Sequence, residues 1–154
     1  MAYFRNGSVP EDRLSIYKTL DDVPSDRRLG YVVREQTNIG YWEAFIEDRR
    51  EESEGLSDSR MRSYNRCERS WKQYMESEGR HYAFADPEHV EGWCEWLLED
   101  RTMGTVYNDY FSILYLFYAF LWYHTDTRHS YNPVLMAAAE GGKTRELWMF
   151  KVSL

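Results

Sequence analysis

The sequence predicts an all-α protein, a compact bundle of four helices preceded by an N-terminal, partly helical extension. Three observations favour this fold class. Proline and glycine are sparse, at four and nine of 154 residues, which is typical of helices joined by short connections. Apolar residues recur at helical spacing, without the alternation of a strand. Capping residues followed by proline mark two of the expected helix starts.

Residues 1–55 form the predicted extension. Its first part is polar, and Trp42, Phe45 and Ile46 then follow i, i+3, i+4 spacing, so a helix is expected over Tyr41–Glu54. The bundle is expected over 56–142. Its first helix begins after the N-cap Ser57 and ends at Gly79.

The apolar face of this first helix is formed by residues at helical spacing: Met61, Tyr64, Cys67, Trp71, Tyr74 and Met75. The second helix opens at Asp86, which caps it, and Pro87. Gly104 separates it from a third helix, Thr105–His124, which is apolar around nearly its whole circumference and is therefore expected at the centre.

The fourth helix opens at Asn132-Pro133 and reaches Gly141. Residues 143–154 are interpreted as a tail or a truncated linker, in which the apolar run from Glu146 is either a strand or the start of the linker.

The apolar stretch Tyr110–Tyr123 is shorter than the ~20 residues that cross a bilayer, so we expect a buried helix and no membrane partner. Cys67 and Cys94 form no CxxC motif and are expected to be reduced thiols in a cytoplasmic protein. His124 and His129, with Asp126, match no common metal spacing. Neither a metal nor a cofactor is therefore expected.

Positive charge is concentrated in one segment, although the net charge is −7. Residues 57–80 carry six basic against four acidic residues, whereas 81–104 carry one against six. Arg62, Arg66 and Arg69 follow i, i+4, i+7 spacing on the face opposite the apolar stripe, and Arg60 lies near the helix start. A row of guanidinium groups can donate paired hydrogen bonds to phosphates, but it is equally the solvated outer face of an ordinary amphipathic helix.

A second polar surface is predicted where the third helix begins. Thr105, Asn108 and Ser112 are small polar residues on an otherwise apolar helix. Side chains at a helix N-terminus can contact a phosphate or a base edge. Capping and simple exposure explain them equally well.

The order of these motifs resembles the N-terminal core-binding, SAM-like domain of the tyrosine recombinase (phage integrase) family. The segments that carry the resemblance lie between Leu56 and Gly142: LSDSRMRSYNRCERSWKQYM, FADPEHVEGWCEWLL, the Gly104-Thr105-Val106 start with its Leu-x-x-Phe-Tyr run, and Asn132-Pro133-Val134. The segments GRHYAFADPEHVEGWC and YNPVLMAAAEG look especially like those of integrase-type proteins of haloarchaea. The acidic, arginine-rich composition fits a saline cytoplasm, and high genomic GC content would also explain the arginines.

The resemblance implies double-stranded DNA as the partner, with one arm of a clamp lying against the major groove. Arg62 matches the family's early basic contact, and Thr105 and Asn108 match the DNA-facing start of its third helix; Arg66 and Arg69 are added from helical geometry. A role in DNA integration and recombination, a nucleoid-associated location, and association with a recombinase catalytic subunit or other protomers are expected accordingly.

The catalytic signature of that family is missing from this sequence. No histidine is followed by arginine at the third position, and no tyrosine follows Tyr131. We therefore expect no strand cleavage, and no enzyme activity, because the covalent step needs those groups.

The alternative is a helical protein–protein interaction module, whose aromatic anchors would be Trp42, Trp93, Trp96, Trp122 and Trp148. Core packing explains most of these tryptophans equally well. A decayed remnant without activity is the third possibility.

Overall fold

A computed structural model describes residues 9–31, 38–124 and 129–152, except for the side chains of 151 and 152. Every regular element within these ranges is helical, which confirms the all-α class. The elements in chain order are η1 (Pro10–Arg13), η2 (Leu20–Asp22), η3 (Ser25–Arg27), α1 (Tyr41–Glu52), α2 (Asp58–Ser77), α3 (Pro87–Leu98), α4 (Met103–Val106), η5 (Tyr107–Phe111), α5 (Ser112–Tyr123), α6 (Pro133–Glu140) and α7 (Gly142–Val152). The elements α4, η5 and α5 follow one another without a break, and η5 is a π-helical turn within this one helix.

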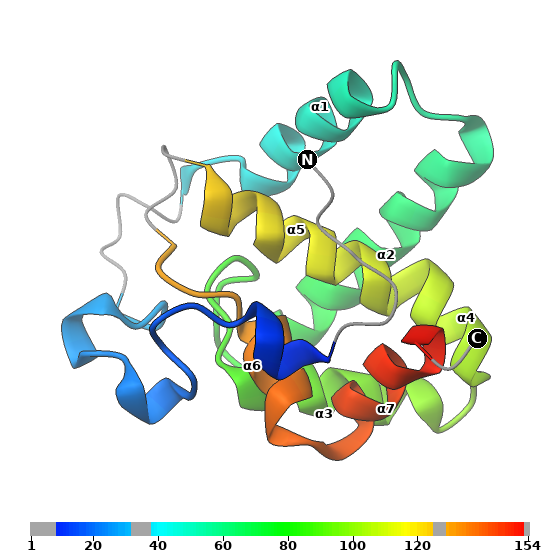
Figure 1. Cartoon of the computed structure of the whole chain (residues 1–154). Coiled ribbons are helices and arrows are strands. Elements are labelled where there is room, and N and C mark those ends of the chain that lie inside the picture. Colours follow the sequence, from blue (N-terminus) through cyan, green and yellow to red (C-terminus); the bar gives the residue numbers. More distant parts are fainter. Residues whose placement is uncertain (1–8, 32–37, 125–128, 153–154) are drawn as a thin grey trace.

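Helix α5 is the centre of the molecule, as its apolar composition predicts. It contacts α1, α2 and α6 (Figure 1). Eight of its twelve residues are buried, so neighbours cover it on several sides. No helix in the described ranges combines the length and the apolar character needed to cross a membrane.

Three of the local start and stop signals of the sequence, at Ser57, Asn132 and Gly79, are confirmed. The Ser57 hydroxyl accepts the N–H of Arg60 at 3.1 Å, and Asn132 Oδ1 accepts the N–H of Val134 at 3.0 Å. Gly79 follows α2 with φ +71°, a left-handed conformation that costs glycine little, and the N–H of Arg80 returns to the Met75 carbonyl at 3.0 Å.

Two boundaries differ from the prediction. The third bundle helix begins at Met103, so Gly104 lies inside α4, because the Thr102 hydroxyl caps it by accepting the N–H of Thr105 at 3.2 Å. The segment after 142 is not a strand in the described part of the chain. It forms α7, and both Leu147 and Trp148 are fully buried there. With the continuous α4–α5 counted as one, the described ranges thus contain six α-helices, where the sequence predicted a bundle of four preceded by an extension.

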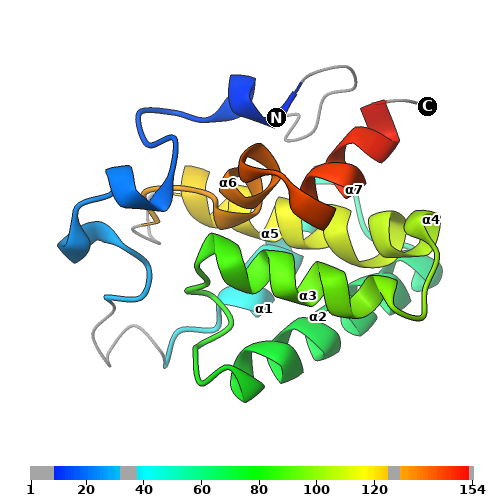
Figure 2. The same ribbon diagram turned by 90° about the horizontal axis from the view of Figure 1, so that it is seen from below.

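The N-terminal segment packs on the bundle. Arg13 donates to the Tyr115 hydroxyl at 3.1 Å and lies 5.4 Å from the ring centroid of Trp148 in α7. The N–H of Leu29 donates to the Tyr131 hydroxyl at 3.0 Å. Figure 2 shows this segment running along the side of the molecule that carries α6 and α7, and η1 contacts α6.

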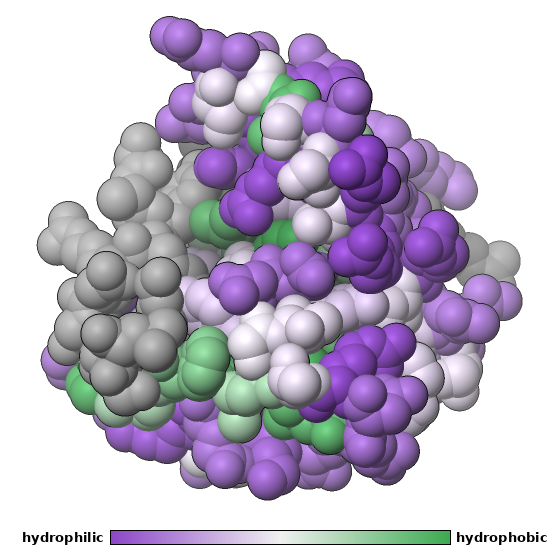
Figure 3. Space-filling view, turned by 90° about the vertical axis from the view of Figure 1, so that its right-hand side faces the viewer, coloured by the Kyte–Doolittle hydropathy of each residue, from purple (hydrophilic) through white to green (hydrophobic). Residues whose placement is uncertain are grey.

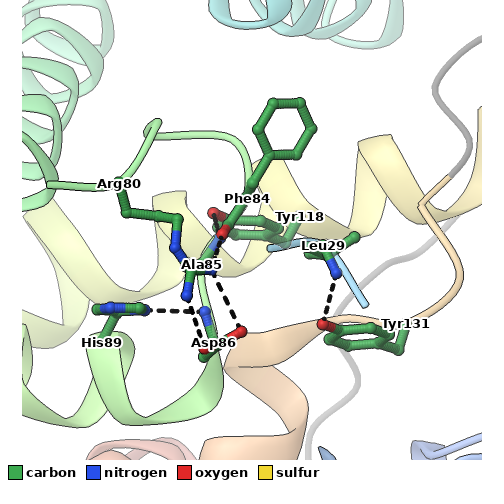
Figure 4. Close-up of polar contacts among 8 residues, drawn as sticks. All are labelled: Leu29, Arg80, Phe84, Ala85, Asp86, His89, Tyr118 and Tyr131. Carbon is green, nitrogen blue, oxygen red and sulfur yellow. Dashed lines mark hydrogen bonds and ion pairs between the residues drawn. The ribbon is translucent and has the colours of Figure 1, made fainter. Parts of the chain in front are cut away.

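A hydrogen-bonded loop sets the path from α2 to α3 (Figure 4). Arg80 donates to the Phe84 carbonyl at 2.7 Å and to the carboxylate of Asp86 at 2.9 Å. The N–H of Ala85 donates to the Tyr118 hydroxyl at 3.2 Å. These contacts satisfy the polar groups of a buried loop and tie it to α5.

Both cysteines belong to the core. Cys67 and Cys94 are free thiols and fully buried. Burial raises the pKa of each thiol, because the thiolate would lose its hydration. They are packing residues, in agreement with the prediction of unpaired thiols.

Candidate nucleic-acid interface

Helix α2 separates an apolar face from a basic one. Tyr64, Cys67, Trp71 and Met75 are buried against the rest of the bundle. The predicted arginine row lies on the opposite side of the same helix, so burial of the apolar face holds the row outward.

The three arginines of the row, and Arg60 near the start of the helix, have different surroundings. Arg62 and Arg69 are exposed and form no ion pair or hydrogen bond with any residue in the described ranges. Arg60 is exposed as well, and its guanidinium lies 5.3 Å from the ring centroid of Tyr64. Arg66 is half-exposed and reaches Asp109 of η5 at 3.4 Å. Three of the four guanidinium groups are therefore without an acidic partner among the described residues.

The contact with Asp109 joins the two predicted surfaces. Asp109 also accepts the hydroxyl of Ser63 at 3.2 Å, so one carboxylate binds two side chains of α2. Asn108, the preceding residue in the chain, is exposed. The first half of α2 and the η5 turn thus lie side by side, as a shared interface requires.

The polar residues of α4, η5 and the start of α5 differ in exposure and in whether their polar atoms are already hydrogen-bonded. Thr105 is exposed, and its hydroxyl accepts that of Thr102 at 3.1 Å. Ser112 is half-buried and donates to the Asn108 carbonyl at 3.2 Å, so its hydroxyl proton is used within its own helix. Asn108 is the member of this group with the most accessible donors and acceptors.

Figure 3 looks at the end of the molecule where α2 begins and α4 lies. Hydrophilic residues cover much of the coloured part of this face, with pale and apolar patches between them. The surface is therefore polar enough to remain hydrated in the free protein, which fits a reversible contact with a charged partner.

Two residues of this region were missed by the sequence reasoning. Asp109 neutralises part of the row, and its only signal was its place beside Asn108. Arg101 lies 5.6 Å from the ring centroid of Trp96 and 5.3 Å from that of Tyr110, and it pairs with Asp100 at 2.8 Å.

The aromatic anchors of the alternative reading are largely unavailable. Trp42, Trp93 and Trp148 are buried in the core, and Trp122 is partly buried. Trp96 differs, since 47% of it is exposed.

No protein-family model, curated protein or solved structure matches this chain.

Other chemistry has little support in the described ranges. No group of three metal-binding side chains occurs there. His129 is buried, with its Nε2 atom 2.8 Å from the Ala83 carbonyl, while His124 is exposed. Asp126, the third member considered from the sequence, lies outside the described residues.

Proposed function

We propose that this protein binds double-stranded DNA through the first half of α2 and the adjoining start of the α4–α5 helix. One observation carries the proposal: Arg62 and Arg69 project from the face opposite the core and have no acidic partner among the described residues. Arginine forks suit phosphate oxygens, which supply most of the affinity of DNA-binding proteins.

Each surface has its own role in this proposal. Arg60, Arg62, Arg66 and Arg69 contact phosphates and set the position of the protein on the duplex. Asn108 can make a paired contact with an adenine edge, and Thr105 can contact a neighbouring base or phosphate. Ser112, with its hydroxyl bonded to its own helix, contributes little.

The resemblance to the core-binding domain of tyrosine recombinases gives this proposal its biological setting. We infer a nucleoid-associated protein that occupies recombination or integration sites and does not cut them, either with a separate catalytic subunit or with other protomers. Because the histidine–arginine and tyrosine signatures are missing from the sequence, an assay should detect duplex binding without strand cleavage.

The test is a titration of a labelled duplex with the wild type and with Arg62→Ala/Arg69→Ala. A charge-assisted hydrogen bond contributes about 1.5–3 kcal/mol, so the variant should bind at least about tenfold more weakly. The matched control is Arg27→Ala/Arg50→Ala, which removes two exposed arginines elsewhere and changes the net charge equally. Equal weakening in both variants would contradict the proposed surface, and so would no weakening in either.

A further inference from the structure

The second half of α2 and the end of α3 enclose a surface groove next to the arginine row. Its cavity of about 340 Å³ is lined by Ser70, Gln73, Tyr74, Ser77 and Trp96. This volume is at the lower end of the range for small-ligand sites, ~300–1,000 Å³. The groove can therefore hold one planar ring system but no folded element.

The arginine row leads into this groove. Gln73 lies four residues after Arg69 and seven after Arg66, so it continues the row along the same face of α2 and also lines the groove. Arg69 is exposed and has no acidic partner among the described residues. A DNA strand whose phosphates follow the row is therefore brought to the mouth of the groove.

Close packing of the two helices forms the floor of the groove. A Cβ atom on Gly92 would clash with the Tyr74 hydroxyl, so the missing side chain lets Tyr74 lie against α3. The indole N–H of Trp93 donates to the Ser70 hydroxyl at 3.0 Å. The groove is therefore present in the free protein, and a ligand need not open it.

Trp96 gives the groove an exposed aromatic surface. Trp93, three residues earlier, is fully buried, whereas 47% of Trp96 is exposed. The guanidinium of Arg101 lies 5.6 Å from the ring centroid of Trp96 and 5.3 Å from that of Tyr110, and these contacts hold the indole in place. An exposed aromatic ring beside cationic residues is the usual platform on which the bases of single-stranded nucleic acids stack.

The charges around the groove differ from one side to the other. Arg69 and Arg101 place two cations near it. The pKa of the Tyr74 hydroxyl rises to about 12, first because of burial and then because of the Glu78 and Glu95 carboxylates. Glu78 lies nine residues beyond Arg69, which is about 14 Å along a helix. A phosphate is therefore expected at Arg69, and an uncharged group within the groove.

Two side chains of the groove have hydrogen-bonding groups available to a ligand. The amide of Gln73 makes no hydrogen bond with any residue in the described part of the chain. The Ser70 oxygen accepts from Trp93, but its own proton goes to no described residue. An amide and a hydroxyl can pair with the donors and acceptors on the edge of a base.

We propose that this groove binds an unpaired nucleobase of the DNA whose phosphates lie on the arginine row. The base stacks on the exposed part of the Trp96 ring, and Gln73 and Ser70 contact its edge. This inference rests on the proposed DNA binding and specifies the substrate as a duplex that continues into a single strand. A base that is already unpaired is favoured, because taking one out of a duplex costs stacking and pairing free energy.

The experiment measures binding of the full chain to labelled duplexes that are blunt, carry a short thymidine tail, or carry an abasic tail of the same length. Both tails have the same phosphates, so their difference isolates the base. The wild type should bind the thymidine tail about tenfold more tightly than the abasic tail, the size of one base stacked on an aromatic side chain. Trp96→Ala should remove this difference without weakening binding of the blunt duplex, and Trp96→Phe should keep part of it.

The matched control is Tyr31→Ala, which removes a 67% exposed aromatic ring from the N-terminal segment and should leave the preference for the thymidine tail unchanged. Because Trp96 is half-exposed, the thermal unfolding of Trp96→Ala should stay close to that of the wild type. Equal wild-type affinity for the two tails, or an unchanged preference in Trp96→Ala, would overturn the proposal.

Two further readouts separate this proposal from its neighbours. A lysine octapeptide that binds the wild type but not Trp96→Ala would assign the groove to a basic protein segment and would overturn the nucleobase. The affinity for the blunt duplex, and its change in Arg62→Ala/Arg69→Ala, tests the arginine row. The difference between the two tails tests the groove, so a failure of the DNA proposal is distinguishable from a failure of this one.

Discussion

An arginine lies near each end of α2, and the two differ in whether their guanidinium groups have partners within the fold. Arg62, in the first turns, projects into solvent without an acidic partner among the described residues. Arg80, just after the last turn, donates to the Phe84 carbonyl and to Asp86, and only 28% of its side chain is exposed. Net charge alone cannot distinguish the two. A guanidinium that is hydrogen-bonded within the fold is unavailable to a partner. One without such contacts is expected to affect binding or solubility and to contribute little to stability.

The first prediction compares the loss of stability when each of these two arginines is replaced by alanine. Arg80→Ala should lower the free energy of unfolding by about 2–3 kcal/mol, since it leaves Asp86 and the Phe84 carbonyl without their donor. Arg62→Ala, at a surface position, should change it by less than about 0.5 kcal/mol. Urea unfolding of the two variants measures both values. A similar small loss in each would show that the loop does not depend on Arg80.

The second prediction applies the comparison to carboxylates. Glu91 accepts the N–H groups of Lys143 and Thr144, at 2.8 and 2.9 Å, and the Thr144 hydroxyl at 2.7 Å, at the start of α7. Glu91→Gln should therefore cost about 1–2 kcal/mol of stability in chemical unfolding. Glu99, exposed at the C-cap of α3, serves as the control, and Glu99→Gln should change stability by less than about 0.5 kcal/mol.

Glu91 also predicts a pH dependence. Burial alone would raise its pKa, but the hydrogen bonds from Thr144 and Lys143 outweigh burial and lower the pKa below the usual 4.5. Its stabilising effect is therefore complete above pH 4.5 and is lost as the pH falls through the lowered pKa. The pKa of the neighbouring Glu95 is raised because of its hydrogen bond with Glu91. As the pH falls below 4.5, the thermal stability of the wild type should decrease more than that of Glu91→Gln. Parallel curves of unfolding temperature against pH would contradict this assignment.

The third prediction concerns Arg66, the intermediate case in the row. Its partner Asp109 lies 3.4 Å away, and both side chains are partly exposed, so the pair contributes little to stability. Asp109→Asn removes one negative charge from the interface and should tighten duplex binding about threefold, from ~0.6 kcal/mol for one charge near a surface. Binding weaker than that of the wild type would show that Asp109 positions Arg66 for the contact.

Local signals predicted three helix boundaries that depend on adjacent residues, although the start of α4 at Met103, capped by Thr102, was missed. Ser57, Asn132 and Gly79 are caps whose partners lie within a few positions, and all three act as expected. The start of α7 could not be predicted, because its cap is Glu91, a residue 53 positions from Thr144 in the chain. The packing of Arg13 on Tyr115 and Trp148 is non-local in the same way.

The candidate site was predictable in part for the same reason. Helical spacing is sufficient to place Arg62, Arg66 and Arg69 on one face. It gives no indication that Asp109 would neutralise Arg66, since that contact joins α2 to η5. Nor does it separate the half-exposed Trp96 from Trp93 three residues earlier, because their difference depends on where α2 lies.

The most direct measurement is the salt dependence of duplex binding by the wild type and by Arg62→Ala/Arg69→Ala. Each phosphate contact contributes about 0.9 to the slope of log affinity against log salt concentration. The account predicts that the double variant lowers this slope by about 1.8, while Arg27→Ala/Arg50→Ala leaves it nearly unchanged. Identical slopes in the wild type and in Arg62→Ala/Arg69→Ala would contradict it.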